Sequence, residues 1–267
     1  VIGAETTTAT AMTYGYNPYL MEWSPFHGAM YAVIESVAKM VALGGRADKI
    51  RLTFQEYFES LGTDSRKWAR AFAAFLGALW AQHQLEIPAI GGKDSMSGTF
   101  MDLTVPPTLT SFAVDVMKAD NALSPEFKVA GSKVYYVPMP KDKLAMPDFR
   151  KLRDTYEKVS NFIAAKKVFA ASSVRMGGTA AAITKMCLGN GIGFRFNSKP
   201  SMEDLFKADY GALILEVAPD SDIKEALAGT GCYELGTTTQ NSNIVAGEAV
   251  IGFAEAKKAY TSPLEKI

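Results

Sequence analysis

The first half of the chain alternates between helical and extended patterns of apolar residues. Ser24-Pro25 begins a helix whose apolar side chains recur on one face as far as Gly44-Gly45. A second helix is predicted from about Asp64 to Gln84, and its apolar stripe consists of Trp68, Phe72, Phe75 and Leu79. Residues 49–54, between the helices, alternate apolar and polar side chains, which predicts a half-buried strand.

Residues 108–117 predict another strand, introduced by Pro106-Pro107. One face carries Leu109, Ser111, Ala113 and Asp115, and the other carries Thr110, Phe112, Val114 and Val116. We expect the second, more apolar set to face the core. Turn-forming and polar residues then follow from about 120 to 132, which is typical of a domain boundary.

The second half predicts an α+β domain. A long helix is expected over 148–165, a short alanine-rich helix after Gly177-Gly178, and strands over 192–196, 212–217, 233–235 and 244–252. The predicted fold class is therefore α/β plus α+β. We expect an α/β domain over 1–128, an α+β domain over 129–260 and a linker or tail over 261–267, with linker character already after Ala256.

Composition narrows the classes of function. The 28 Lys and Arg residues balance the 28 Asp and Glu residues without a basic cluster, so neither nucleic acid nor an acidic membrane surface is an expected partner. No stretch approaches 18 uninterrupted apolar residues, and we expect a cytoplasmic protein. Cys187 and Cys232 suit core thiols in a reducing compartment, and His27 and His83 suit structural positions on helices. A first residue other than Met suggests a part of a longer polypeptide.

The loop Gly91-Gly92-Lys93-Asp94-Ser95-Met96-Ser97 is the first candidate for chemistry. Glycines let the backbone approach an anion, Lys93 and Ser95 suit phosphate oxygens, and Asp94 could hold hydrated Mg²⁺. The spacing is neither that of a Walker A loop nor that of a dinucleotide-binding turn. Composition alone favours a polar surface turn.

Two further groups carry candidate residues. Glu35 and Lys39 are spaced i, i+4, which predicts either an ordinary surface ion pair or a Glu35 carboxylate that points into a cleft and binds a metal bridging phosphates. Residues 172–178, Ser-Ser-Val-Arg-Met-Gly-Gly, lead into a helix whose N-terminal amides could face an anion. A plain glycine entry to the helix is the commoner explanation for that pattern.

The order of these features resembles phosphoribosylformylglycinamidine synthase. The resemblance rests on Ala11-Met12 with Gly15 and Pro18, on Ala32 to Val37, on Gly92 to Ser97 after Ile87-Pro88, and on Pro107 to Ala113. It points to the second synthetase half-unit of the large single-chain form, with a two-domain fold like that of aminoimidazole ribonucleotide synthetase. The N-terminal domain would lack its first strands.

The resemblance implies a role in purine biosynthesis. The complete enzyme is an ATP- and glutamine-dependent carbon–nitrogen ligase that converts formylglycinamide ribonucleotide to the amidine. In the family the second half-unit holds an auxiliary, structural nucleotide with Mg²⁺, so the isolated fragment is expected to be inactive. The implied partners are the first synthetase half-unit and a glutaminase domain of the parent chain, and we expect a lone half-unit to form a homodimer.

Carried over by position, Glu35 matches the metal-binding Glu of the family's Glu-x-x-x-Asn helix, but Lys39 replaces the Asn. Met176 replaces the second Asp of the His-Asp-x-Ser-Asp-Gly-Gly loop. The implied nucleotide site, for ATP or ADP, comprises Gly91, Gly92, Lys93, Asp94, Ser95 and Lys39, with Glu35 as the metal ligand. Because two ligands are lost, we expect weak or absent Mg²⁺ binding, with Lys39 and Arg175 neutralising phosphate. The alternatives are a scaffold module that binds no nucleotide and a free-standing, kinase-like enzyme of the same superfamily.

Overall fold

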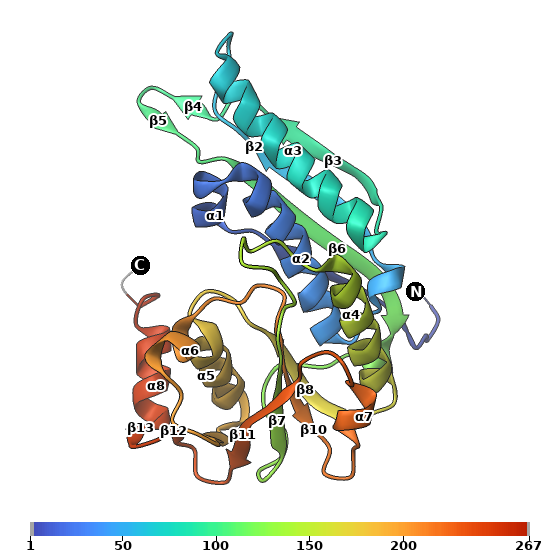
Figure 1. The fold of residues 1–267 in the computed structure, drawn as a ribbon, viewed down its shortest axis with the longest axis vertical. Helices are drawn as coiled ribbons and strands as arrows, with labels where there is room; N and C mark the ends of the chain where they lie inside the picture. Colours follow the sequence, from blue (N-terminus) through green and yellow to red (C-terminus); the bar gives the residue numbers. More distant parts are fainter. Residues whose placement is uncertain (1–2, 266–267) are drawn as a thin grey trace.

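Two β-sheets divide the chain, as Figure 1 shows for the computed structural model, which describes residues 3–265. The first sheet has the strand order β1-β6-β2-β3, formed by β1 (Thr8–Gly15), β2 (Arg51–Tyr57), β3 (Ala89–Ser95) and β6 (Thr108–Lys118). The second sheet uses strands between residues 133 and 251. The predicted domain bounds remain a prediction. Residues 1 and 2 of the predicted first domain, and residues 266 and 267 of the predicted tail, lie outside the described residues.

Helix α2 (Pro25–Leu43) is the central element, packed between the first sheet and the second domain. The Ser24 hydroxyl accepts a hydrogen bond from the His27 amide at its start, and Gly44, with φ of 102°, ends it in a left-handed conformation. Its length and hydropathy would allow it to cross a membrane, but 78% of that 18-residue stretch is buried within the structure, as in a core helix. The helix predicted from Ser24 to Gly44 is confirmed.

Helix α3 (Ser65–Leu85) packs through small residues. Ala71, Ala74, Gly77, Ala78 and Ala81 are on its buried side. A Cβ on Gly77 would lie 2.0 Å from the Phe26 carbonyl oxygen, so glycine is required for this close approach to α2. The aromatic stripe lies outward, with Trp68, Phe72, Phe75 and Leu79 between 42% and 61% exposed. Because α3 packs closely against α2, its alanine face lies in the core.

The expected orientation of the strand at 108–117 is wrong. Leu109 and Ala113 are fully buried against α2, whereas Val116 is 66% exposed. The polar members of the buried face are satisfied there, because the Ser111 hydroxyl hydrogen-bonds the Ser36 hydroxyl at 2.9 Å and Asp115 accepts a hydrogen bond from the Arg46 amide at 2.9 Å. The more apolar face is left open, beside the exposed β1 side chains Met12 and Tyr14.

The remaining elements of the first half are short. They are α1 (Pro18–Trp23), η1 (Ala47–Lys49), the strands β4 (Thr99–Phe100) and β5 (Leu103–Thr104), which form a two-stranded sheet, and η2 (Ala119–Asn121). The strand predicted at 49–54 begins later, at Arg51, because η1 occupies residues 47–49. The strand β1 was not predicted, since the threonine- and alanine-rich segment lacks a strong alternating pattern.

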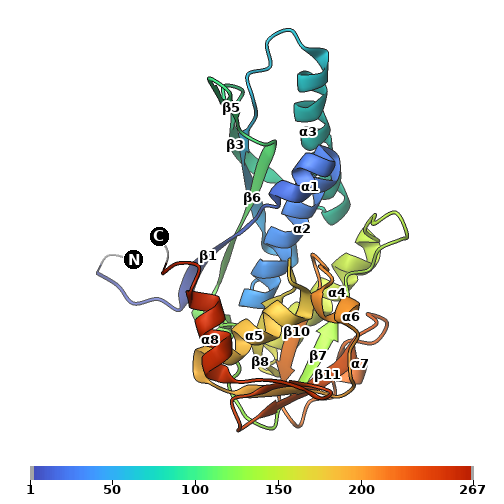
Figure 2. The same cartoon turned by 90° about the vertical axis from the view of Figure 1, so that its left-hand side faces the viewer.

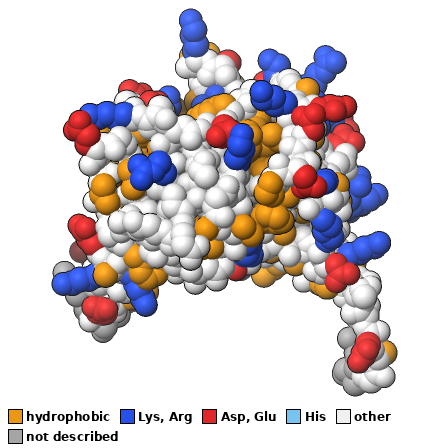
Figure 3. Space-filling view, turned by 90° about the horizontal axis from the view of Figure 1, so that it is seen from below, with side chains coloured by type: hydrophobic (Ala, Val, Ile, Leu, Met, Phe, Trp, Pro, Cys, Tyr) orange, Lys and Arg blue, Asp and Glu red, His pale blue; other side chains and the backbone are white. Residues whose placement is uncertain are grey.

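The second sheet has the strand order β13-β12-β9-β11-β7-β10-β8. Its strands are β7 (Lys133–Val137), β8 (Val168–Ser173), β9 (Gly193–Phe196), β10 (Leu213–Val217), β11 (Tyr233–Thr239), β12 (Ile244–Ala246) and β13 (Ala249–Ile251). The helices are α4 (Phe149–Ala164), α5 (Gly178–Asn190), α6 (Met202–Phe206), α7 (Ile223–Ala226) and α8 (Phe253–Thr261). Figure 2 shows α5 and α8 side by side above the strands, and Figure 3 shows acidic and basic side chains interspersed around the lower face.

Two expectations for this half are wrong. Ser172 and Ser173, expected to begin the loop of residues 172–178, instead end the edge strand β8. The segment after Ala256 is not a linker, because α8 continues to Thr261 and Ala256 is buried. The strand predicted over 244–252 is divided into a hairpin, since Gly247 turns the chain with φ of 62°.

The Cys187 thiol gives the fold a pH dependence that can be measured. It is 1% exposed, and burial raises its pKa from 9.0 to about 12. Folding therefore disfavours the thiolate. The contribution of the buried, neutral thiol to the free energy of unfolding is complete below pH 9 and is lost as the pH rises towards 12, at about 1.4 kcal/mol per pH unit. In urea unfolding between pH 8 and 11, the Cys187→Ala variant should show a shallower alkaline decline than the unchanged chain. Equal slopes would refute this assignment.

Candidate functional site

Helix α2 places Glu35 and Lys39 inside the structure rather than on a solvated face. Glu35 is 4% exposed, and the Lys39 ammonium lies 2.7 Å from its Oε1. The Arg175 guanidinium, from the turn between β8 and α5, lies 3.6 Å from the same oxygen. Glu35 and Lys39 are thus not an ordinary surface ion pair. Glu35 is a buried carboxylate between two cations from different domains.

The end of β1 holds the Lys39 side chain. The Lys39 Nζ donates to the Tyr14 carbonyl oxygen at 2.6 Å and lies 4.2 Å from the centre of the Tyr14 ring. This contact depends on Gly15, because a Cβ there would lie 2.0 Å from the Ala32 carbonyl oxygen of α2. Close packing of β1 on α2 therefore positions the ammonium.

A cavity of about 240 Å³ opens beside Glu35. Its lining combines both domains and includes Tyr16, Asn17, Arg175, Met176, Lys185 and Tyr210. The Asn17 side-chain amide donates to the Tyr210 hydroxyl, which joins the start of α1 to the segment before β10. The cavity is therefore built only when the two domains pack together.

The electrostatics of this cavity favour an anion. Arg175 and Lys185 line it together with the single carboxylate of Glu35, and Lys39, which does not line the cavity, pairs with that carboxylate at 2.7 Å. Burial lowers the pKa of Lys39, with Arg175 and Lys185 acting in the same direction and Glu35 opposing them. Burial and the neighbouring Arg175 also lower the pKa of Lys185. A bound anion would relieve the repulsion among these cations.

The donor set does not fit Mg²⁺. Mg²⁺ prefers carboxylate and other oxygen ligands in octahedral geometry, but the Glu35 oxygen is held by an ammonium at 2.7 Å. Met176, whose thioether is a poor Mg²⁺ ligand, lines the same cavity. Within residues 3–265, no cluster of three or more His, Cys, Asp or Glu side chains is placed to hold a metal ion.

The predicted glycine loop lies elsewhere. Gly91, Gly92, Lys93, Asp94 and Ser95 are in β3, at the opposite edge of the first sheet from β1. They form a strand rather than a turn, and a Cβ on Gly92 would lie 2.8 Å from the carbonyl oxygen of Phe54 on the paired strand β2. The Lys93 ammonium lies 4.8 Å from the centre of the Tyr57 ring. Within this chain, Gly91 to Ser95 therefore do not converge with Lys39, the other predicted nucleotide residue, or with Glu35.

Sequence reasoning missed Asn17, Lys185 and Tyr210 as parts of the cavity. Asn17 carried a local signal, because Asn-Pro is a helix start and Asn17 accepts from the Leu20 amide as the N-cap of α1. Lys185 and Tyr210 carried none, since only the packing of the second domain brings them to α2.

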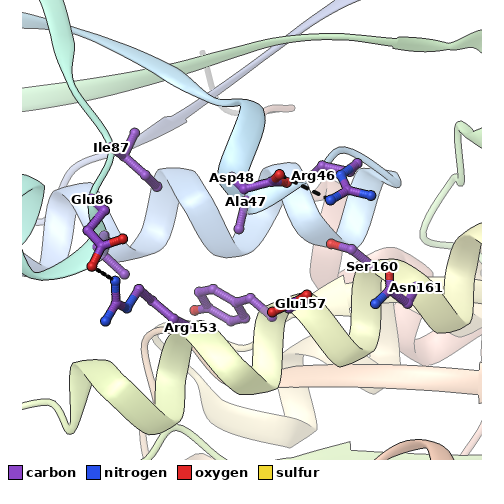
Figure 4. Close-up of a pocket in the computed structure, with 11 residues that line it drawn as sticks. Arg46, Ala47, Asp48, Glu86, Ile87, Arg153, Glu157, Ser160 and Asn161 are labelled. Carbon is purple, nitrogen blue, oxygen red and sulfur yellow. Dashed lines mark hydrogen bonds and ion pairs between the residues drawn. The ribbon is translucent and has the colours of Figure 1, made fainter.

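A second cavity, of about 390 Å³, lies where α4 meets the end of α3 and η1 (Figure 4). Arg153 forms an ion pair with Glu86, and Arg46 forms one with Asp48 at 2.9 Å. The Ser160 hydroxyl donates to the Gly45 carbonyl oxygen at 3.1 Å. These groups mainly satisfy one another, which is typical of a domain junction.

Comparison with known proteins shows what the chain as a whole is similar to. No family model matches it. The chain is 26% identical over 96% of its length to phosphoribosylformylglycinamidine synthase subunit PurL of Picrophilus torridus, and 25% identical over 85% of its length to the PurL subunit of Methanocaldococcus jannaschii. The resemblance to phosphoribosylformylglycinamidine synthase is confirmed. The chain spans 37% and 35% of the length of these two PurL relatives.

Solved structures show the same synthase fold. PurL of Thermotoga maritima complexed with FGAR has a TM-score of 0.76 and 14% identity, covering 93% of this chain and 46% of that chain. A thiamine monophosphate kinase from Aquifex aeolicus has a TM-score of 0.61 and 12% identity, covering 92% of this chain and 89% of that chain. The predicted fold class, a half-unit of the aminoimidazole ribonucleotide synthetase-like kind, is therefore confirmed.

Proposed function

We propose that this chain is the second synthetase half-unit of a large, single-chain phosphoribosylformylglycinamidine synthase. The parent protein would be the cytoplasmic ATP- and glutamine-dependent ligase that forms formylglycinamidine ribonucleotide. The PurL relatives support this role, and Thermotoga maritima PurL has been solved complexed with ATP, with ADP and with AMPPCP. This half would act as an auxiliary nucleotide-binding unit without a complete active site.

The buried cluster of Glu35, Lys39 and Arg175 carries the proposal. The resemblance implies metal ligands at positions 39 and 176, and the chain has an ammonium and a thioether there. Lys39, Arg175 and Lys185 would neutralise the phosphate groups of ADP or ATP directly, as charge-assisted donors. Nucleotide binding would therefore need little or no Mg²⁺.

The open surfaces suit the proposed partners. The face of the first sheet opposite α2 exposes Met12, Tyr14 and Val116, and we place the first synthetase half-unit against it. A glutaminase domain of the parent chain would supply ammonia. In the isolated chain a second copy would cover the same sheet face as a homodimer. A PurLQS assembly from Thermotoga maritima, in which the related chain has a TM-score of 0.71, supports assembly with partners in general.

Loss of the Lys39 ammonium tests the nucleotide site. In calorimetric titration with ADP, Lys39→Met should weaken binding about tenfold or more, because a charged hydrogen bond to phosphate contributes ~1.5–3 kcal/mol. Lys49→Met is the matched control, since the Lys49 side chain is 63% exposed and lies 3.8 Å from Asp48, whereas Lys39 pairs with Glu35 in the cavity lining. Equal ADP affinity of the two variants would count against a phosphate site at Lys39.

Two other functions make different predictions. A pure scaffold would bind no ADP at all. A free-standing kinase-like enzyme is favoured by one observation, because the chain covers 89% of the Aquifex aeolicus kinase and 85% of the hydrogenase maturation protein HypE solved with ATP. Such an enzyme would hydrolyse or transfer phosphate alone, whereas we expect the isolated chain to form no amidine from glutamine or ammonia.

A further inference from the structure

Two cavities lie at the contact between the two domains, on different sides of helix α2. One is the Glu35 cavity, of about 240 Å³. The other, of about 390 Å³, is the junction cavity, where α4 meets the end of α3 and η1 (Figure 4). Figure 1 and Figure 2 both show α4 and α5 on either side of α2. Because both helices belong to the second domain, a rotation of that domain that widens one cavity narrows the other.

A hydrogen bond connects the two cavities through the second domain. Tyr156 of α4 lines the junction cavity and is 1% exposed. Its hydroxyl donates to the Gly211 carbonyl oxygen at 2.9 Å, and the preceding residue, Tyr210, lines the Glu35 cavity. Gly211 also lies close against α2, because a Cβ there would be 2.8 Å from the Ile34 Cγ2. The contact of Gly211 with Ile34 therefore lies between the two cavities, as a pivot would.

The sizes of the cavities give the direction of the rotation. Pockets for small molecules and cofactors usually enclose ~300–1,000 Å³, so the Glu35 cavity has to widen to admit a nucleotide. The Arg175 guanidinium lies 3.6 Å from the Glu35 Oε1, and a phosphate group that enters beside Glu35 separates them. The junction cavity provides the room for the compensating movement of α4 towards α3.

Polar contacts across the junction cavity already draw α4 towards the first domain. Arg153 of α4 forms an ion pair with Glu86 at the end of α3, and Figure 4 shows the two side chains meeting across the cavity. The Ser160 hydroxyl, which is 6% exposed, donates to the Gly45 carbonyl oxygen at 3.1 Å. These contacts therefore favour the form of the chain in which the Glu35 cavity is wider.

We propose that the second domain rocks about the contact of Gly211 with Ile34, so that nucleotide binding at Glu35 narrows the junction cavity. The Arg153–Glu86 ion pair then promotes nucleotide binding from the far side of α2. This motion presupposes the proposed nucleotide site and makes Arg153 and Glu86 positioning residues of that site. Both lie outside the lining of the Glu35 cavity, and they act by shifting the equilibrium between the two forms of the chain.

A pair of spin labels measures the motion with and without a ligand. Nitroxides on His83→Cys and Lys151→Cys, two exposed positions on α3 and α4, report the separation of the helices in a Cys232→Ala background. In double electron–electron resonance, Glu86→Gln should lengthen the mean label distance without any ligand, because the ion pair between the helices is lost. Saturating ADP should shorten the distance when Glu86 is unchanged.

The affinity for ADP tests the effect on the site. In calorimetric titration, Glu86→Gln and Arg153→Gln should each weaken ADP binding about twofold to fivefold, as expected for the loss of a partly exposed ion pair. Asp154→Asn is the matched control, because the ion pair of Asp154 with Lys158, at 2.7 Å, lies within α4. It should leave both the ADP affinity and the label distance unchanged.

A cavity-filling change tests the role of the empty space itself. Ala47 of η1 lines the junction cavity, and Ala47→Leu blocks the approach of α4 while it leaves the Arg153–Glu86 ion pair in place. This change should weaken ADP binding about fivefold or more and prevent ADP from shortening the label distance, because the narrower cavity would be overpacked.

Failure of the motion and failure of the nucleotide site give different results. If ADP does not bind to the unchanged chain, both the nucleotide site and its coupling to the junction cavity are wrong. If ADP binds but leaves the label distance unchanged, or binds Ala47→Leu with full affinity, the rocking motion is overturned and the nucleotide site stands.

Discussion

Replacing Asp209 with alanine should lower the free energy of unfolding by about 3 kcal/mol, since it leaves buried polar groups without their partner. Asp209 is 9% exposed and accepts hydrogen bonds from the Tyr136 hydroxyl at 2.6 Å and the Met139 amide at 3.3 Å. Its other oxygen lies 2.5 Å from the Lys141 ammonium. Urea unfolding at neutral pH measures the loss.

The matched control is Asp220→Ala. Asp220 forms an ion pair with Lys167 at 3.3 Å, but its side chain is 78% exposed, so the change should cost less than about 1 kcal/mol. Asp209→Asn should lie between the two, because the amide oxygen keeps one acceptor. If Asp209→Ala were no more destabilising than Asp220→Ala, the buried network would have no net role in holding the segment that carries Tyr210.

The double variant Lys39→Asn/Met176→Asp should convert the cavity to Mg²⁺-dependent binding. The two changes add oxygen ligands next to Glu35 and remove the ammonium that occupies its carboxylate. In ADP titrations with and without Mg²⁺, its affinity should differ by about tenfold or more, which corresponds to ~1.4 kcal/mol. Without Mg²⁺, it should bind ADP more weakly than the unchanged chain, because one cation is lost.

A methionine elsewhere provides the control for this gain. Met202 is 70% exposed and does not line the cavity, so Lys39→Asn/Met202→Asp should lose ADP affinity without gaining a Mg²⁺ response. If both double variants behaved alike, Met176 would not occupy the position of a metal ligand.

Local signals predicted the elements that depend on neighbouring residues. Ser24 and Gly44 bound α2 as expected, because capping and left-handed termination are decided within one turn of the helix. The same rules could not orient the strand at 108–117. Its buried face depends on how closely α2 approaches, and that contact favours the smaller Ser111 and Ala113 side chains over Phe112 and Val114.

The candidate site was only partly accessible to sequence reasoning. Glu35 and Lys39 emerged from their spacing and from the family resemblance, and the structure pairs them, with Glu35 lining the cavity and Lys39 bound to its carboxylate. The contact of Arg175 with Glu35 depends on the packing of two domains, which no local pattern encodes. Gly91 to Ser95 were expected in the same nucleotide site, but parallel pairing with β2 holds them at the far sheet edge.

The exposed aromatic stripe of α3 has a different explanation. Helical periodicity identifies an apolar face but does not say whether this chain or a partner covers it. The sequence therefore identified Trp68 and Phe72 as the apolar stripe of the helix, although α3 buries its alanine face within this chain. Apolar residues at helical spacing predict that the face is in contact with something, but other evidence is needed to identify the molecule that makes the contact.

Calorimetric titration of the unchanged chain with ADP, in excess Mg²⁺ and again in EDTA, tests the central claim most directly. If Lys39, Arg175 and Lys185 replace the metal, ADP should bind with nearly the same affinity in both conditions. ADP binding that is tight in Mg²⁺ and lost in EDTA would contradict a cation-based phosphate site.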